Sequence, residues 1–376
     1  MKNLWPPWLM TGMILAMFLA RCPVSAVAAP PVQYTIADLG PSQVVTIAPT
    51  DPTVVGSQVV GRQQTAFVLS PTTTNLGYLP QGNFSRANGA YGPAVVGYSS
   101  TGPFALYTHA FRWTAAAGMQ DLGTTGAVDL FSAATGINGA GTIVGYADSP
   151  DRATIVPVVW IEGQVSLLPT LSTDNAYADA INANGDIVGD ASTANGETHA
   201  VLWPVSGGVV DLHTTSGTFS LALGINNVGQ VVGYASTASG ARGFVWLPLT
   251  GMLTLDPLPG DEDSYAYAIN DAGVIVGQSV LPDPVLEQET TQAVRWDNGV
   301  PTALLTLVTN GDGWELSTAV GVNQAGVIVG TGALNGQTRG YMLTPDPPLA
   351  ADPPDDPPAH KYHHKHRHTT LVRFGR

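Results

Sequence analysis

The chain has 376 residues and a net charge of −14, and only 11% of its residues are charged whereas 44% are apolar. This composition excludes a disordered chain, because it supplies enough apolar surface to bury a large core. The segment 30–345 contains no lysine and only scattered arginines, so the body has no basic stripe that could neutralise phosphates, and we expect no nucleic-acid binding by it.

The first 29 residues predict a secretory signal peptide. Lys2 precedes an apolar run that ends in the small residues Ala26–Ala29, the order of regions found in such signals. Cys22, the single cysteine, lies where a bacterial lipoprotein carries its acylated cysteine, but Arg21 replaces the small residue needed before it. We therefore favour removal of Cys22 with the signal over lipidation. No later apolar stretch reaches the roughly 18 residues that span a bilayer, so we expect a secreted, periplasmic or extracellular protein without a transmembrane segment.

A twelve-residue phrase recurs along the body. The copies are GINGAGTIVGYA, AINANGDIVGDA, GINNVGQVVGYA, AINDAGVIVGQS and GVNQAGVIVGTG, which begin at Gly136, Ala180, Gly224, Ala268 and Gly321. The first four copies start 44 residues apart, and a fixed period of this size indicates a duplicated structural unit that stacks on its neighbours. Counting the related second and third strands adds two degenerate units before these, so we predict seven units.

Each unit contains four short strand patterns. In the fourth unit these are 178–182, 186–189, 199–203 and 208–212, and the tetrad Asn-Ala-Asn-Gly at 182–185 forms the turn between the first two. Alternating, β-branched and aromatic residues dominate, and no long pattern with a period of 3.6 residues is present. The sequence therefore predicts an all-β fold.

The two ends of the array predict that it closes into a ring. The last unit stops after its third strand at 341–343, whereas the segment 32–40 matches the fourth-strand pattern at 118–123. An open stack would leave both ends unpaired, so we predict a seven-bladed β-propeller over 30–345 whose last blade is completed by the N-terminal strand.

Small residues stand two and four positions before each turn asparagine, which suits inner strands that crowd together at a propeller axis. These pairs are Ala134 and Gly136, Ala178 and Ala180, Ala222 and Gly224, Ala266 and Ala268, and Ala319 and Gly321. We interpret the turn asparagines themselves as residues that cap the backbone of the turn, not as a ligand ring. They are Asn138, Asn182, Asn226, Asn270 and Asn323.

The phrases HAFRW at His109 and GMQDLG at Gly118, together with the recurring A-x-[AG]-[IV]-N-x-x-G-x-[IV]-V-G core, resemble the HAF repeat of bacterial extracellular proteins. The resemblance covers nearly all of 32–345. It implies an exported bacterial protein, without a defined molecular activity and without catalytic residues to carry over. The units at Arg242 and Gln292 depart from the motif because they lack its histidine, so we do not expect this histidine to be a shared chemical group. We interpret His109 and His199 as strand-edge residues, too far apart for one metal ion.

Two acidic loops next to the sixth blade are the candidate ligand-binding sites of the body. Their residues are Asp261, Glu262, Asp263, Asp312, Trp314 and Glu315. The carboxylates could hold Ca²⁺, or could lie beside an aromatic platform on which a sugar or cationic ligand stacks. The alternative is ordinary solvated surface. No nucleophile elbow, zinc-protease helix, phosphate-binding loop or dinucleotide fingerprint is present.

The C-terminal segment changes in composition. We predict a Pro/Asp-rich linker over 346–359 and a disordered His/Lys/Arg-rich tail over 360–376. In the tail, a transition metal could bind His363, His364, His366 and His368. The whole tail could instead contact an anionic surface such as lipopolysaccharide, or could have no partner.

These observations favour an exported, non-catalytic binding or surface-interaction module. Its long-loop face would meet a glycan, a peptide or an envelope component, because loops on a rigid scaffold usually carry function. The alternative is a propeller hydrolase or lyase that acts on polysaccharide with carboxylates on that same face and a possible need for Ca²⁺.

Overall fold

The computed structural model describes residues 32–347, apart from the gaps at 103–106, 127–129, 214–216 and 284–287. The predicted signal peptide, nearly all of the predicted linker and the His-rich tail with His363, His364, His366 and His368 lie outside the described residues.

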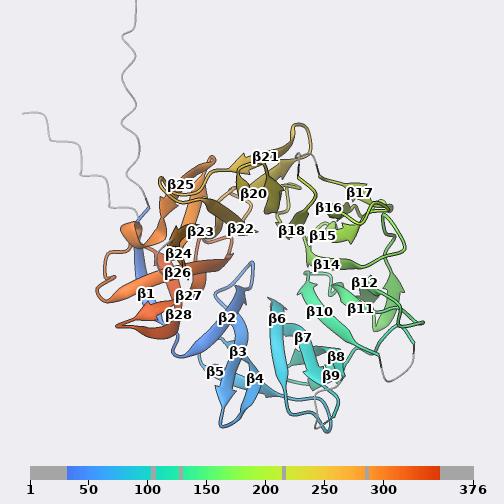
Figure 1. Ribbon diagram of the computed structural model, residues 1–376. Helices are drawn as coiled ribbons and strands as arrows, with labels where there is room; N and C mark the ends of the chain where they lie inside the picture. The colour runs from blue at the N-terminus through green and yellow to red at the C-terminus, as the bar shows by residue number, and fades with distance from the viewer. Residues whose placement is uncertain (1–31, 103–106, 127–129, 214–216, 284–287, 348–376) are drawn as a thin grey trace, which may run out of the picture. The chain divides into compact units, whose positions relative to one another are not determined.

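The repeats fold into seven four-stranded antiparallel sheets, the blades of a β-propeller (Figure 1). Blades 1 to 3 contain β2 (Ser42–Ile47), β3 (Val54–Val60), β4 (Gln63–Leu69), β5 (Thr73–Gly77), β6 (Ser85–Tyr91), β7 (Ala94–Ser100), β8 (Thr108–Thr114), β9 (Gly118–Asp121), β10 (Ser132–Ile137), β11 (Ile143–Asp148), β12 (Ile155–Ile161) and β13 (Gln164–Leu167). Blades 4 to 6 contain β14 (Ala176–Ile181), β15 (Ile187–Ser192), β16 (Thr198–Trp203), β17 (Val210–Asp211), β18 (Ser220–Ile225), β19 (Val231–Thr237), β20 (Gly240–Leu247), β21 (Gly251–Leu255), β22 (Asp263–Ile269), β23 (Ile275–Asp283), β24 (Gln288–Asp297) and β25 (Val300–Ala303). The predicted fold class is confirmed.

The seventh blade joins the two ends of the array. It consists of β26 (Trp314–Val322), β27 (Ile328–Leu334), β28 (Gln337–Pro345) and, as its outer strand, β1 (Tyr34–Asp38). β1 pairs antiparallel with β28 in a register that sets Tyr34 opposite Pro345 and Asp38 opposite Tyr341. The blue first strand therefore lies beside the red last strand in Figure 1, and the predicted closure is confirmed.

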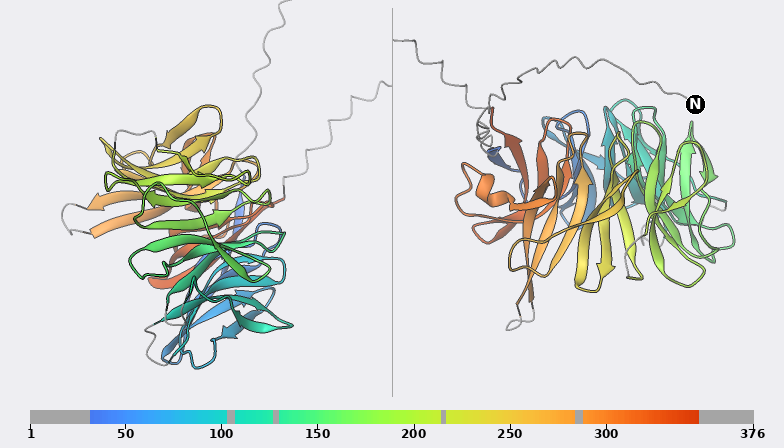
Figure 2. Two further views of the ribbon diagram at one scale, coloured as in Figure 1. Left: turned by 90° about the vertical axis from the view of Figure 1, so that its right-hand side faces the viewer. Right: turned by 90° about the horizontal axis from the view of Figure 1, so that it is seen from above.

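Seen from its edge, each blade runs between two faces of the ring (Figure 2). The turns between first and second strands lie on one face, and the connections between second and third strands lie on the other, because successive strands are antiparallel. A short 3₁₀ helix, η1 (Leu304–Leu307), links blades 6 and 7. None of the helices in the described part of the chain is long and apolar enough to cross a membrane.

Apolar side chains pack between neighbouring blades. Each of the seven core clusters draws its residues from two adjacent sheets. The third-strand tryptophans Trp160, Trp203 and Trp296 are at most 2% exposed, and each contributes about 3 kcal/mol through the apolar area it buries. The stability of the ring therefore resides at the blade junctions.

The inner strand of every blade contains a β-bulge, where one extra residue interrupts its pairing with the second strand. In blade 4 the extra residue is Asp179, between Ala178 and Ala180. The equivalents in the other blades are Val45, Asn88, Thr135, Leu223, Tyr267 and Val320. We call these seven the bulge residues. They break the strict alternation of the strand and turn one side chain toward the propeller axis.

The small residues predicted at the axis are required by close contacts there. A Cβ on Gly321 would lie 3.1 Å from the backbone nitrogen of Ile47 in the next blade. On Gly136 it would lie 3.3 Å from Val144 and 3.5 Å from Ile181 of the following blade. These approaches leave little room for a larger side chain, and they support the steric interpretation.

Candidate functional site

The two strand-edge histidines have structural partners within their own blades. Nδ1 of His109 lies 2.8 Å from a carboxylate oxygen of Asp121, and Nδ1 of His199 lies 2.8 Å from one of Asp211. Each pair joins the third strand of its blade to the fourth, which explains why histidine and Asp-Leu occur together in these units. No metal is needed to account for them.

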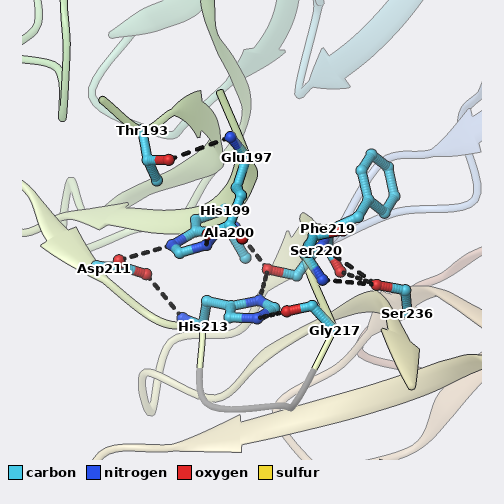
Figure 3. Close-up of polar contacts among 11 residues, drawn as sticks. Thr193, Glu197, His199, Ala200, Asp211, His213, Gly217, Phe219, Ser220 and Ser236 are labelled. Carbon is cyan, nitrogen blue, oxygen red and sulfur yellow. Dashed lines mark hydrogen bonds and ion pairs between the residues drawn. The ribbon is translucent and has the colours of Figure 1, made fainter. Parts of the chain in front are cut away.

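Around His199 the polar contacts resemble a catalytic triad in composition (Figure 3). The His213 ring stacks on that of His199 at 4.2 Å, and its Nδ1 lies 2.7 Å from Oγ of Ser220. Ser220, however, has no exposed surface, and its Oγ accepts the backbone N–H of Ala200. The corresponding serines of three other blades, Ser85, Ser132 and Ser264, accept an equivalent N–H. Ser220 is therefore an inter-blade bridge and not a nucleophile.

The first predicted acidic loop is tied into the junction of blades 5 and 6. Asp261 accepts a hydrogen bond of 2.6 Å from the hydroxyl of Ser279. Asp263 accepts one of 2.8 Å from the backbone of Ala241 and lies 3.5 Å from the Arg242 guanidinium. The side chain of Glu262 is exposed. Two of the three carboxylates thus have partners within the fold.

The second predicted loop does not form an aromatic platform. Trp314 is only 7% exposed and packs edge-on against Tyr341, with 6.3 Å between ring centroids. Since its faces are covered, the prediction that Trp314 offers a stacking surface is wrong. Asp312 and Glu315 are exposed. Within the described ranges, no group of three or more His, Cys, Asp or Glu is arranged to hold a metal ion, so a calcium site at these loops gains no support.

A cavity of about 630 Å³ lies at the axis, where the seven inner strands converge. All seven bulge residues line it, together with Arg86 and the aliphatic residues that precede the turns. Turn residues such as Ala183, Asn227 and Gln324 also line it, so the cavity reaches the face of the short turns. This face lies opposite the long-loop face that the sequence analysis favoured.

The turn asparagines join blade to blade, and three of them, Asn138, Asn182 and Asn226, line this cavity. Oδ1 of Asn226 accepts the backbone N–H of Gln230 in its own turn, as predicted for a capping residue. Its Nδ2 donates to the carbonyl oxygen of Asn270 in the next blade at 3.0 Å. The same link leads from Asn138 to Asn182, from Asn182 to Asn226, and from Asn270 to Asn323. Buried hydrogen bonds contribute about 1 kcal/mol each, so these links hold neighbouring blades together at the turns.

Blade 4 departs from the other repeats at two positions, one half-buried and one buried. Its bulge residue is Asp179, where neighbouring blades carry Thr135 and Leu223. Its second strand carries Asp190, which pairs with Tyr177 and is 8% exposed. The equivalent positions of blades 2, 3 and 5 hold tyrosine, namely Tyr98, Tyr146 and Tyr234.

Both carboxyl groups have strongly perturbed proton affinities. Burial and, to a smaller extent, the nearby Asp190 carboxylate together raise the pKa of Asp179 to about 8. Burial alone raises the pKa of Asp190 to about 7. The phenol of Tyr146 next to them has its pKa raised to about 12, mainly by burial and then by Asp179. Perturbed groups of this kind gather at functional sites, and Asp179 lines the cavity directly.

Arg86 is the positively charged residue of the cavity lining. It occupies inner strand β6 opposite Tyr98. Its Nε is buried and has no hydrogen-bond partner. Neither Arg86 nor Asp179 was a candidate in the sequence analysis. The available signal was the departure of Asp179 and Asp190 from the tyrosine, threonine and leucine of the other copies.

No protein-family model matches the chain, and no curated protein matches its sequence. The fold is similar to the β-propeller domain of the Trilobed protease from Pyrococcus furiosus, with a TM-score of 0.47 and 11% identity over 71% of this chain and 84% of that chain. It is also similar to AofleA from Arthrobotrys oligospora (TM-score 0.41, 12% identity, 72% and 88%) and to the BP39L lectin from Burkholderia pseudomallei (TM-score 0.38, 9% identity, 85% and 98%). The chain covers about half, 51%, of the similar TolB from Acinetobacter baumannii, with a TM-score of 0.39, 11% identity and 56% of this chain matched. At these TM-scores and sequence identities, the similarities are limited to the propeller fold and indicate no ligand or activity.

Proposed function

We propose that this protein is an exported binding module that takes up a small polar ligand in its axial cavity. The observation that carries the proposal is the cavity of about 630 Å³, a size typical of small-molecule sites. Its wall combines an aliphatic ring with a few polar side chains, the usual composition of such sites. Export from a bacterium and membership of the HAF-repeat family belong to the same proposal, and the N-terminal composition and the repeated motif support them.

Binding is favoured over hydrolysis or elimination because the carboxylates are not paired at the cavity. Glycoside hydrolysis by acid and base catalysis needs two carboxyl groups of the enzyme that flank the scissile bond of the substrate. Asp190 is not part of the cavity lining, whereas Asp179 and Asp271 are. Both carboxylate oxygens of Asp271 already accept hydrogen bonds from Asn227, at 2.8 Å each. One available carboxylate suits recognition better than a two-carboxylate mechanism.

Filling the cavity tests this function. Leu223→Trp places a large side chain at a bulge position without changing a blade junction, so it should remove binding while the protein stays folded. Val210→Trp on outer strand β17, where the native side chain is 43% exposed, is the matched control. Monosaccharides, amino acids and short peptides are first screened by thermal shift against the wild type. We expect a ligand found in this way to bind V210W as tightly as the wild type. In calorimetry it should bind L223W at least about 100-fold more weakly, because the tryptophan occupies its site.

The circular dichroism spectrum of L223W checks its fold. A ligand that binds L223W as tightly as wild type would place the site elsewhere, and a screen without any ligand for wild type would remove the proposal.

A further inference from the structure

We propose that the ligand of the axial cavity is a small zwitterion, whose carboxylate binds Arg86 and whose ammonium binds Asp179. This inference rests on the proposed function of the cavity and names the class of molecule that it takes. α-Amino acids and short peptides belong to this class.

Arg86 supplies the site for the carboxylate. Its side chain lines the cavity, and it forms no ion pair or hydrogen bond with any described residue. The residue is half-buried, and its buried Nε–H costs free energy because it has lost water and gained no acceptor. The planar group matches a carboxylate through two parallel hydrogen bonds. A ligand carboxylate is therefore the group that would satisfy it.

Asp179 supplies the site for the ammonium. It projects from the bulge of β14 into the cavity, and no described residue donates a hydrogen bond to its carboxylate or forms an ion pair with it. The Asp190 carboxyl group acts on its pKa, and Asp179 in turn acts on the pKa values of the Tyr146, Tyr177 and Tyr234 phenols. No described cation pairs with Asp179, so a bound ammonium would supply the counter-charge that allows its carboxyl group to ionise.

The two charges stand apart on one side of the cavity. Arg86 belongs to blade 2 and Asp179 to blade 4, and both act on the phenol of Tyr146 in blade 3, with opposite effects on its pKa. Among the described residues, no ion pair or hydrogen bond joins Arg86 to Asp179. A bound molecule can therefore bridge them across blade 3.

Other ligand classes would leave a charge unmatched. A neutral polyol could bond both groups but would compensate neither charge, a simple anion would leave Asp179 without a counter-charge, and a simple cation would leave Arg86 without one. The remainder of a zwitterion would lie against the aliphatic ring nearer the turns, which is formed by Ile47, Ala90, Ile137, Ile181, Ile225, Ile269 and Val322.

The test is calorimetric titration of the full chain with the common α-amino acids and glycyl dipeptides. For the tightest ligand, the carboxamide and the N-acetyl derivative each lack one of the two charges. We expect each derivative to bind about 10- to 100-fold more weakly than the zwitterion, because a charge-assisted contact is lost.

Two variants assign each charge to its residue. The Arg86→Gln variant should bind the zwitterion and its carboxamide with equal affinity. The Asp179→Asn variant should bind the zwitterion and its N-acetyl derivative with equal affinity. Arg62 and Asp174 are exposed. The control variants Arg62→Gln and Asp174→Asn should therefore keep the wild-type preference for the zwitterion over its two derivatives.

Preferences that persist in R86Q or D179N would overturn the assignment, and so would failure of every zwitterion to bind. A neutral saccharide that binds wild type but not L223W would overturn the zwitterion while leaving the binding function intact.

Discussion

Asp179 and Asp190 place two titratable groups in a part of the fold that the other repeats keep apolar or neutral. In the folded protein their pKa values are about 8 and about 7, whereas an exposed aspartate titrates near 3.8. Between these pH values the folded state holds protons that the unfolded chain releases. The free energy of unfolding therefore falls as pH rises from about 4 to about 8, and the stabilising protonated form is fully present only at the acidic end.

Asp179→Asn should remove much of this pH dependence. The amide resembles the protonated carboxyl in size and charge, so the variant should match wild type near pH 4 and exceed its unfolding free energy by about 2 kcal/mol or more near pH 9. Denaturant unfolding at both pH values measures the difference. The exposed carboxylate of the same blade provides the control D174N, which should follow wild type throughout. Equal stability of D179N and wild type at pH 9 would show that Asp179 is ionised there without cost.

The sequence contains the evidence for this pair, but not for its position. Asp179 and Asp190 differ visibly from Thr135, Leu223 and Tyr234 in the aligned repeats. A strand that alternates strictly would, however, direct Asp179 into a blade junction. The bulge turns it toward the axis instead, and sequence periodicity does not reveal a bulge that is shared by every copy.

Among the strands, the bulge explains the glycine of the recurring [IV]-V-G sequence of the second strand. The backbone carbonyl of the residue two before each bulge residue lies directly over the second strand. A Cβ on Gly233 would lie 1.8 Å from the carbonyl oxygen of Leu221, and the equivalent distance at Gly189 is 2.0 Å. The same overlap, at 1.9 to 2.1 Å, occurs at Gly56, Gly97, Gly145, Gly277 and Gly330.

Gly233→Ala should therefore destabilise the protein by about 3 kcal/mol or more, because the inner strand must shift or the bulge must be lost. Gly102→Ala, whose added methyl meets nothing within 4 Å, should change stability by less than about 0.5 kcal/mol. Thermal unfolding of the two variants gives the comparison. A G233A protein as stable as wild type would mean that the bulge relaxes easily.

For the whole molecule, closure of the ring rests on β1. Tyr34 is fully buried, its hydroxyl accepts a hydrogen bond from Arg295 in blade 6, and its carbonyl oxygen accepts one of 2.9 Å from Thr309. The strand thus contacts the last two blades as well as completing the sheet. This much followed from the sequence, because the missing fourth strand of the last repeat had a matching segment at the start of the body.

Tyr34→Ala should cost about 3 to 5 kcal/mol through the cavity it leaves. Tyr34→Phe, which removes only the hydroxyl, should cost about 1 to 2 kcal/mol. The neighbouring Thr35 is exposed, and Thr35→Ala serves as the control with an expected loss below about 0.5 kcal/mol. Urea unfolding ranks the three variants. If Y34A unfolded no earlier than T35A, closure by β1 would contribute nothing to stability.

The face that carries the cavity could not be predicted in the same way. Loop length and acidity are visible in the sequence, and they directed attention to Asp261–Asp263 and to Trp314. The cavity instead depends on how closely seven inner strands approach one another, which is set by blade packing. Trp314 in particular was assigned to a loop, whereas it begins β26 and fills the core between blades 6 and 7.

The bulge has one more consequence. Asn88 and Thr135 donate hydrogen bonds of 2.9 Å and 2.7 Å to carbonyl oxygens of the next blade, and Val320 packs against the core between blades 7 and 1. The side chains of Val45, Asp179, Leu223 and Tyr267, in contrast, belong to none of the seven core clusters. A substitution at one of these four positions can therefore alter what the centre of the ring recognises while the surrounding architecture is retained. Natural variation, or a protein engineer, can change these four sites and so obtain new specificities from an unaltered frame.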